Sequence, residues 1–117
     1  PFYHAVTHNF YAIIKERVVD LFRRTELLEQ QANQAMQLNV LVQGNGFPIL
    51  CLHGHPGSGQ SMAVFTRHLS QRFQTFAPDL RGYGSSRTAH PFEMSTHLCD
   101  LDALLDRYQI QQCAIVG

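Results

Sequence analysis

The chain carries little charge of either sign, and its charges cancel. Charged residues make up 15% of its 117 residues, and nine basic side chains are balanced by nine acidic ones. Nucleic acids and acidic membranes attract proteins through clustered positive charge, and the sequence holds no long basic run. We therefore expect neither of these partners, and the hydrophobic fraction of 44% indicates a globular fold.

Cysteines are few, and their number is odd. The three, Cys51, Cys99 and Cys113, lie far apart, and no pair has the CxxC spacing. Such a set does not provide the disulfide framework of a small secreted domain. Two lie in apolar runs typical of strands and one in a helical pattern, so we expect buried free thiols in a reducing compartment.

Long hydrophobic runs are also missing from the sequence. The longest, residues 47–52, contains Pro48 and is far shorter than the ~20 residues that a membrane-spanning helix needs. The N-terminus lacks the basic-then-apolar pattern of a signal peptide. A cytoplasmic location is therefore expected, while the oligomeric state is left open.

The two ends of the sequence are unusual. The chain begins at Pro1 without an initiator Met, and it stops at Gly117, directly after a strand-like run. We expect both ends to be cuts in a longer protein.

The N-terminal residues have helical periodicity. Across residues 9–24, apolar side chains recur at helical spacing and charged ones lie mostly on the other side, which predicts an amphipathic helix. We assign residues 1–25 to an N-terminal helical extension. His4 and His8 are four residues apart, but without the Glu of an HExxH motif or a third nearby ligand no metal site is expected.

Two strand signals and a turn follow. Residues 26–31 suggest a short first strand, and residues 36–43 alternate in the manner of a half-buried one. Gly44-Asn45-Gly46 then tolerates the positive φ angles of a tight turn. The apolar run that follows predicts a strand over residues 48–53, paired antiparallel with residues 36–43.

From residue 48 onward, strands and helices alternate. The predicted elements are a helix over 60–72 capped by Ser58 or Ser61, a strand over 73–77, a Gly-rich loop over 79–86, a helix over 94–108 capped by Ser95 or Thr96, and a strand over 112–116. Such alternation is typical of βαβ crossovers. The expected fold class is α/β, a mostly parallel sheet with an antiparallel N-terminal hairpin, flanked by helices.

Chemistry is expected first in the loop over residues 53–59, HGHPGSG, because ligands of open α/β sheets bind at the carboxyl ends of strands. One hypothesis is a phosphate-binding loop, since Gly54-x-x-x-x-Gly59-Gln60-Ser61 matches G-x-x-x-x-G-K-[ST] at all positions but one. Gln60 replaces the Lys that neutralises phosphate charge, and Pro56 removes one backbone N–H. This nucleotide-binding module is the weaker alternative.

The other hypothesis is an oxyanion hole. Acyl transfer places negative charge on a carbonyl oxygen, and backbone N–H groups held in a turn stabilise that charge. Gly54 allows a sharp turn, and Pro56 restrains the chain without an N–H of its own. The N–H of His55, between them, is left to point into the crevice.

These residues resemble a motif of the α/β-hydrolase fold family. HGHPGS resembles the HGxP motif after the family's third strand, and Gly44-Asn45-Gly46 resembles the turn before that strand. Residues 77–86 (APDLRGYGSS) resemble the motif D-x-R-G-x-G-x-S. Residues 100–117 resemble the helix and strand that precede the nucleophile elbow. The resemblance covers residues 26–117, which we assign to a partial α/β-hydrolase domain that contains strands 1–5.

The resemblance implies a hydrolase that acts on a small, largely apolar substrate, such as an ester, an epoxide or a haloalkane, through a nucleophile–His–acid triad without a cofactor. Gly117 matches the first Gly of the nucleophile motif, so the triad is expected beyond this chain, and the chain alone is expected to be inactive and poorly stable, with an exposed edge at residues 112–116. His55 is the expected oxyanion donor and pocket residue. The other motif positions are His53, Gly54, Pro56, Gly57, Asp79, Arg81, Gly82 and Gly84.

Several further residues invite a catalytic interpretation that their surroundings do not favour. His53 is expected to hydrogen-bond the turn rather than act as a base, and a metal-binding HxH is discounted because no Asp-His follows it. Ser58, Ser85 and Ser86 lack G-x-S-x-G and are expected to be cap and turn residues. Asp79 and Arg81 are expected to pin the Gly-rich loop. A non-catalytic binding module of the same fold is a further alternative.

Overall fold

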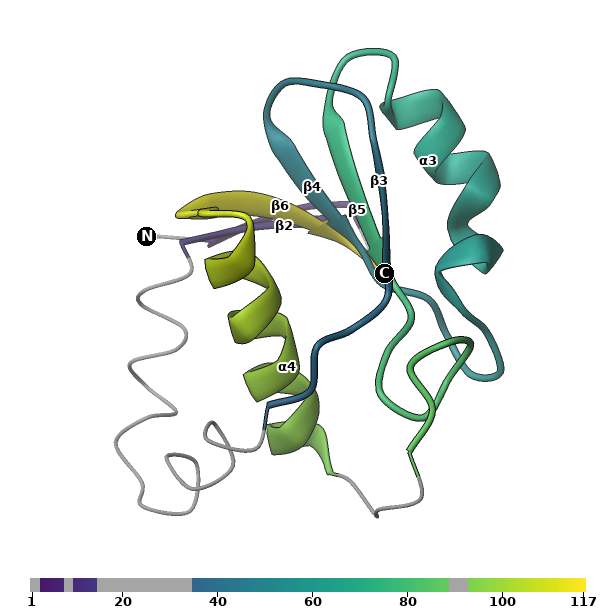
Figure 1. Cartoon of the computed structure of the whole chain (residues 1–117). Helices are drawn as coiled ribbons and strands as arrows, with labels where there is room; N and C mark the ends of the chain where they lie inside the picture. Colours follow the sequence, from purple (N-terminus) through teal and green to yellow (C-terminus); the bar gives the residue numbers. More distant parts are fainter. Residues whose placement is uncertain (1–2, 8–9, 15–34, 89–92) are drawn as a thin grey trace.

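The computed structural model describes residues 3–7, 10–14, 35–88 and 93–117. These residues form a six-stranded sheet with helices on both faces (Figure 1). In chain order the elements are β1 (Tyr3–Thr7), β2 (Phe10–Ile14), β3 (Val40–Gln43), β4 (Pro48–Cys51), the 3-10 helix η1 (Gly59–Met62), α3 (Ala63–Leu69), β5 (Gln74–Pro78), α4 (Met94–Arg107) and β6 (Gln112–Val116).

The strand order is β1-β2-β6-β4-β5-β3, and the centre of the sheet is parallel. β4 pairs parallel with both β5 and β6, whereas β3 and β2 pair antiparallel on the outer sides of β5 and β6. Parallel neighbours need crossover connections, and α3 and α4 provide them. The expected α/β class is confirmed, and the sheet as a whole is mixed.

The predicted hairpin between residues 36–43 and 48–53 is wrong. The turn itself forms, with φ angles of 75° at Gly44 and 116° at Gly46. However, β5 lies between the two strands, so that Val42 and Leu50 both pair with Phe76. The turn chemistry fixes the reversal of the chain, but it does not determine which strand becomes the neighbour of β4.

The helix predicted over residues 9–24 is wrong for residues 10–14, which form β2. Aromatic and β-branched residues fill this stretch, and they favour strands when a partner is available. β2 pairs with β1 and β6, which also covers the edge of residues 112–116 that we expected to be exposed. The rest of that helix and the strand predicted at 26–31 lie outside the described residues.

Apolar side chains fill both faces of the sheet. One cluster contains Leu38, Leu50, Phe76, Leu104, Leu105, Ile110 and Cys113. The other contains Ile49, Cys51, Ala77, Ala114 and Val116, with Met62, Leu69 and Phe73 packed against it. α4 covers the first and α3 the second, so β4 is buried on both sides, as its uninterrupted apolar run predicts.

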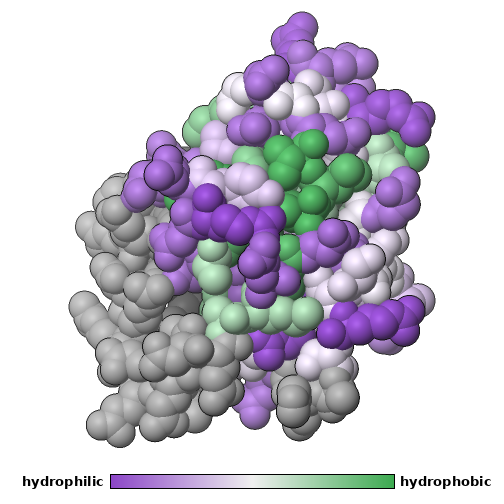
Figure 2. Space-filling model, viewed as in Figure 1, coloured by the Kyte–Doolittle hydropathy of each residue, from purple (hydrophilic) through white to green (hydrophobic). Residues whose placement is uncertain are grey.

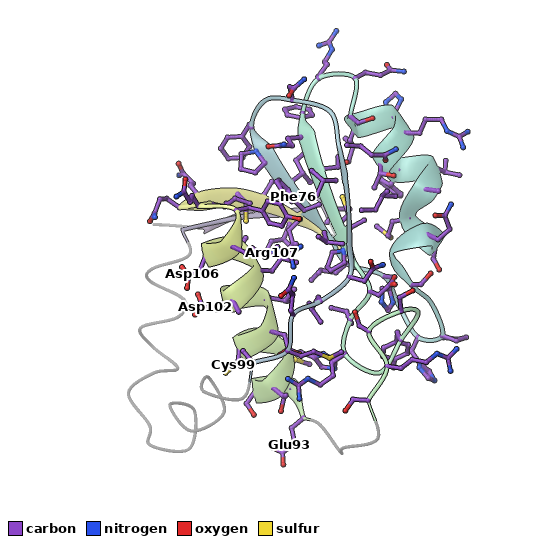
Figure 3. The ribbon with its side chains drawn as sticks, viewed as in Figure 1. Phe76, Glu93, Cys99, Asp102, Asp106 and Arg107 are labelled. Carbon is purple, nitrogen blue, oxygen red and sulfur yellow. The ribbon has the colours of Figure 1, made fainter. Side chains whose placement is uncertain are left out.

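The helix boundaries agree with the predicted ranges to within a few residues, and one predicted cap differs. Ser58 precedes η1, and its backbone N–H donates to Ser61 Oγ at 3.0 Å. α4 is preceded by Glu93 rather than capped by Ser95 or Thr96. Thr96 Oγ1 instead accepts a hydrogen bond from the N–H of Glu93 at 3.3 Å. Glu93 lies at the lower end of α4 in Figure 3.

The expectation of free cysteines is confirmed. Cys51 and Cys113 are buried in β4 and β6, Cys99 is half-buried in α4, and none forms a disulfide. Burial raises the pKa of Cys51 and of Cys113 to about 11. These two thiols are therefore protonated and unreactive in the folded protein.

The surface mixes polar residues with a limited amount of apolar area. In Figure 2, hydrophobic residues gather where Figure 1 draws β3 and are surrounded by hydrophilic ones. Within the described part of the chain, β3 is the outer strand of the sheet on that side. In the same part of the chain, every helix is too short or too polar to cross a membrane.

Candidate active site

Two loops and Gly117 meet at the carboxyl end of the parallel strands. β4, β5 and β6 are parallel, so residues 53–59, residues 79–86 and Gly117 all follow the carboxyl ends of neighbouring strands. The N–H of Leu52 donates to the Val116 carbonyl at 2.8 Å, which holds the start of the first loop beside the end of β6. The motifs that are far apart in the sequence are therefore assembled at one place.

His53 connects these two loops. It is 6% exposed; its Nε2 accepts a hydrogen bond from the N–H of Leu80 at 3.0 Å, and its Nδ1 lies 2.8 Å from the Gly54 carbonyl oxygen. A ring nitrogen that accepts from an N–H carries no proton, so Nδ1 is the one that donates. Both nitrogens are occupied by backbone groups, which supports the structural role expected for His53.

Asp79 holds the backbone of both loops. Its Oδ1 accepts a hydrogen bond from the N–H of Gly59 at 2.6 Å, and its Oδ2 accepts from the N–H of Ser85 at 2.9 Å and from Asn39 Nδ2 at 3.0 Å. Burial alone would raise the pKa of Asp79, but these three hydrogen bonds, with a smaller contribution from His53, lower it below its ordinary value. The carboxylate is therefore charged and used entirely for positioning.

Two glycines make this arrangement possible. A Cβ on Gly84 would lie 2.5 Å from the Asp79 carboxylate, and the φ of Gly84 is 51°. A Cβ on Gly59 would collide with the Ala77 carbonyl oxygen. Gly54 differs, because its φ is not positive and a Cβ there would meet no atom of the described residues within 4 Å. The sharp turn expected to depend on Gly54 therefore does not need a glycine for conformational reasons.

Arg81 fastens the second loop to α4. Its Nε and Nη2 donate to the two carboxylate oxygens of Asp100 at 2.8 and 2.7 Å, and both side chains are buried. Asp100 Oδ1 also accepts the N–H of Met36 at 2.7 Å. The bonds to Asp100 raise the pKa of Arg81, against the opposing effect of burial. Together with the contacts of Asp79, this geometry supports the expectation that Asp79 and Arg81 pin the Gly-rich loop.

His55 is exposed to solvent at the carboxyl end of the parallel strands. Within the described ranges, no group accepts a hydrogen bond from its backbone N–H. Its peptide bond to Pro56 is cis. The imidazole Nδ1 lies 2.7 Å from Tyr83 Oη, and the ring of Tyr83 contacts the rings of both His53 and His55 edge-on, at 5.1 and 5.5 Å between centroids. His55 therefore presents an available N–H while its side chain is held by the second loop.

Comparison with known families agrees with this geometry. Residues 48–117 match a family model described as the alpha/beta hydrolase fold. The chain belongs to the α/β-hydrolase family. The matched range includes both motif loops and ends at Gly117, and the part of the predicted resemblance before residue 48 lies outside it.

Curated relatives of this α/β-hydrolase chain are epoxide hydrolases. It is 28% identical to a soluble epoxide hydrolase of Corynebacterium sp. (strain C12) over 95 residues, which are 80% of this chain and 33% of that protein. It is 32% identical over 90 residues to an epoxide hydrolase of Caballeronia sordidicola, with coverage of 74% and 27%. The chain thus spans about a third or less of the length of these relatives.

A solved structure gives the same fold. A marine microorganism esterase superimposes with a TM-score of 0.62 at 25% identity, covering 65% of this chain and 30% of that one. As with the curated relatives, the shared part is a minor fraction of the whole enzyme.

The phosphate-binding hypothesis meets a physical obstacle in this α/β-hydrolase chain. A phosphate would need the N–H groups at the start of η1, but the N–H of Gly59 already donates to Asp79 and the N–H of Ser58 to Ser61. A carboxylate at this position also repels a phosphate. With the family match over the same residues, these contacts argue against a nucleotide-binding loop.

The remaining candidates have the surroundings expected of them. Ser58 precedes η1, the N–H of Ser85 donates to Asp79, and buried Ser86 accepts the N–H of Asn39 on its Oγ at 2.9 Å. Across residues 35–88 and 93–117, with β1 and β2, no cluster of His, Cys, Asp and Glu could hold a metal ion. His8 lies outside the described residues.

Three contributors to the site escaped sequence analysis. Tyr83 was hidden inside the Gly-rich motif, Asn39 was assigned only to a strand, and Asp100 was assigned only to a helix. Their partners lie 28, 40 and 19 positions away in the chain, respectively. A buried carboxylate such as Asp100 needs a cationic partner, but its burial is visible only in the fold.

Proposed function

We propose that this chain supplies the oxyanion-binding half of a hydrolase active site, with the backbone N–H of His55 as one of two donors. The observation that carries this proposal is an N–H without an acceptor among the described residues, placed where three parallel strands end. Such a donor is useful because it is already oriented before charge develops on the substrate oxygen. Asp79 and His53 keep it so oriented by fixing the loop on both sides.

The proposed reaction is nucleophilic hydrolysis. For an ester, a nucleophile adds to the carbonyl carbon, the C=O π pair moves to oxygen, and the tetrahedral intermediate then collapses and expels the alcohol, which takes up a proton. For an epoxide, the nucleophile attacks a ring carbon, the C–O pair stays on the ring oxygen, and that oxygen takes up a proton. In both cases water then hydrolyses the covalent ester intermediate, which releases the product and restores the nucleophile. The N–H of His55 stabilises the ester oxyanion. The nucleophile, the second donor, the acid and the catalytic His are proposed to follow Gly117, in keeping with a relative of which the matched residues make up only 33%.

The proposed substrate is a small, largely apolar molecule. The named relatives are epoxide hydrolases, and one structural neighbour is an esterase, so both substrate types are candidates. The exposed imidazole of His55 is proposed to line the pocket beside the reacting group. No cofactor is needed for this chemistry.

Replacing His55 tests the oxyanion role in the full-length protein. His55→Pro removes the N–H, and kcat should fall about 100- to 1000-fold. His55→Ala is the matched control, since it removes the imidazole but keeps the N–H, and it should lose less than about tenfold in kcat. Equal losses in the two variants, with both still folded by thermal melting, would refute the role of the N–H.

The residues after Gly117 decide between an enzyme and a binding module. We expect a nucleophile two positions later, with Ser favouring ester hydrolysis and Asp favouring epoxide hydrolysis. Any other residue there would favour the non-catalytic alternative.

A further inference from the structure

The hydrogen bond between His55 and Tyr83 fixes where one remaining side-chain donor lies. Nδ1 of the imidazole and Oη of the phenol are 2.7 Å apart and share a hydrogen bond. If the phenol donates, Nε2 carries the remaining imidazole proton. If the imidazole donates, the phenol proton is free. In either case the neutral pair retains one unused donor, an N–H or an O–H.

That donor is available to a ligand. His55 is exposed and Tyr83 is half-buried, and no group of the described residues hydrogen-bonds Nε2 of His55. His53, which also contacts the Tyr83 ring, cannot take this role because both of its nitrogens are bound to backbone. The pair is therefore a side-chain donor that this end of the sheet offers in addition to backbone N–H groups of the 53–59 loop.

The pair is also held in place from the Tyr83 side. The N–H of Tyr83 donates to the Leu80 carbonyl at 2.9 Å, and the Tyr83 carbonyl accepts the N–H of Ser86 at 2.8 Å. The glycines on either side of Tyr83 have φ angles of 89° and 51°, and the second packs on Asp79. Tyr83 thus sits on a fixed turn, and its hydroxyl determines where the imidazole of His55 rests.

We infer that Tyr83 and His55 form a specificity element that donates a hydrogen bond to a second oxygen of the substrate, next to the reacting group. This inference rests on the proposed function. The favoured substrates are small, largely apolar esters or epoxides with an ether or carbonyl oxygen close to the reacting carbon. Substrates of the same shape without that oxygen leave the donor unpaired and bind less well.

Matched substrate pairs test this in the full-length protein. Phenyl methoxyacetate and phenyl butanoate differ by one O-for-CH₂ exchange, as do ethyl glycidyl ether and 1,2-epoxyhexane. The measured quantity is the ratio of kcat/KM within a pair. Because every variant sees the same two substrates, their intrinsic difference in reactivity cancels when ratios are compared.

Tyr83→Phe should lower the wild-type preference for the oxygen-bearing substrate about fivefold, the size expected for one neutral hydrogen bond. The loss should lie mainly in KM, since the donor contacts bound substrate and transition state alike. His55→Phe, which keeps the backbone N–H, should give a similar loss. The double variant should lose no more than either single one, because each single variant already breaks the hydrogen bond that holds the remaining donor in place.

Tyr108→Phe is the control. Its hydroxyl accepts a hydrogen bond from Arg107 at 2.7 Å and its ring packs on Phe76, on the α4 side of the sheet, so the ratio should stay unchanged. Thermal melting verifies that each variant is folded.

An unchanged ratio in Tyr83→Phe, including an equal loss on both substrates, overturns the inference while the proposed function stands. Additive losses in the double variant overturn the pairing. Wild-type protein that hydrolyses none of the four substrates overturns the proposed function, and this inference with it.

Discussion

Asp79 binds backbone N–H groups that take no part in the hydrogen bonds of a helix or strand. Its two carboxylate oxygens bind N–H groups from residues 59 and 85 and the amide of Asn39. Charge-assisted hydrogen bonds of this kind are roughly twice as strong as neutral ones. The sequence predicted that Asp79 pins the Gly-rich loop, but it did not predict the bond to Gly59, which belongs to the other loop.

Asp79→Asn should destabilise the full-length protein in a pH-dependent way. The folded-state pKa of Asp79 is lowered, so the carboxylate contributes stability above its unfolded pKa, and this contribution is lost as pH falls through the lower, folded value. The variant should lose about 2 kcal/mol of unfolding free energy at neutral pH. Urea titrations at neutral and at strongly acidic pH should show a smaller difference in acid. A difference that does not shrink would contradict the charge-based explanation.

At the scale of elements, the loop after β5 is attached to α4 by one buried ion pair. Arg81 and Asp100 form two hydrogen bonds, and Asp100 also receives the N–H of Met36, so three segments converge on one carboxylate. Near the C-terminal end of α4 (Figure 3), Arg107 donates to the Leu38 carbonyl at 3.3 Å and lies over the ring of Tyr108. The position of α4 thus depends on polar contacts at its middle and near its C-terminal end as well as on its apolar face.

Asp100→Ala should cost about 3 kcal/mol or more of unfolding free energy, because it removes the carboxylate that accepts two hydrogen bonds from the buried Arg81 guanidinium. Replacing both partners, with Arg81→Met and Asp100→Leu, should recover part of this loss. Met94→Ala, at an exposed position of the same helix, is the control and should change stability by less than about 0.5 kcal/mol. Denaturant unfolding measures all three. A double replacement that is as unstable as Asp100→Ala would argue against the buried-charge explanation.

Element types in the second half of the chain could be predicted from the sequence, and strand neighbours could not. The apolar run of β4 and the helical stripe of α4 are local patterns, and both elements form where they were predicted. Pairing depends on contacts between distant segments, so the turn at Gly44 gave no sign that β5 would lie between β3 and β4. The prediction for residues 10–14 failed for the same reason, because they pair with β6, which is distant in the sequence.

At the scale of the whole molecule, two thiols report on the two faces of the sheet separately. Cys51 belongs to the cluster under α3, and Cys113 belongs to the cluster under α4. Their raised pKa values, about 11 in each case, keep both thiols protonated near neutral pH. Reaction with a thiol reagent therefore requires the corresponding face to open.

Thiol labelling should show whether the faces open together. In full-length protein with Cys99→Ser, Cys51 and Cys113 should react slowly and at equal rates at pH 8, because neither thiolate forms before the sheet separates from its helices. Mass spectrometry of peptides measures each rate. Rapid labelling of one thiol alone would show that its face opens independently.

In the proposed site, the backbone N–H of His55 stabilises charge, and the side chain of the same residue, with Tyr83, supplies a second donor. Under this proposal, position 55 can exchange its side chain while the amide remains, so substrate preference can change without loss of the charge-stabilising N–H. Proline is the exception, since it removes the amide itself. Directed evolution at positions 55 and 83 should accordingly yield many active variants with altered preferences, whereas variation at Gly59 or Gly84, where no side chain fits, should yield few. In the proposed site, substrate preference can thus change at positions 55 and 83 while Gly59 and Gly84, which allow the loops to form, stay the same.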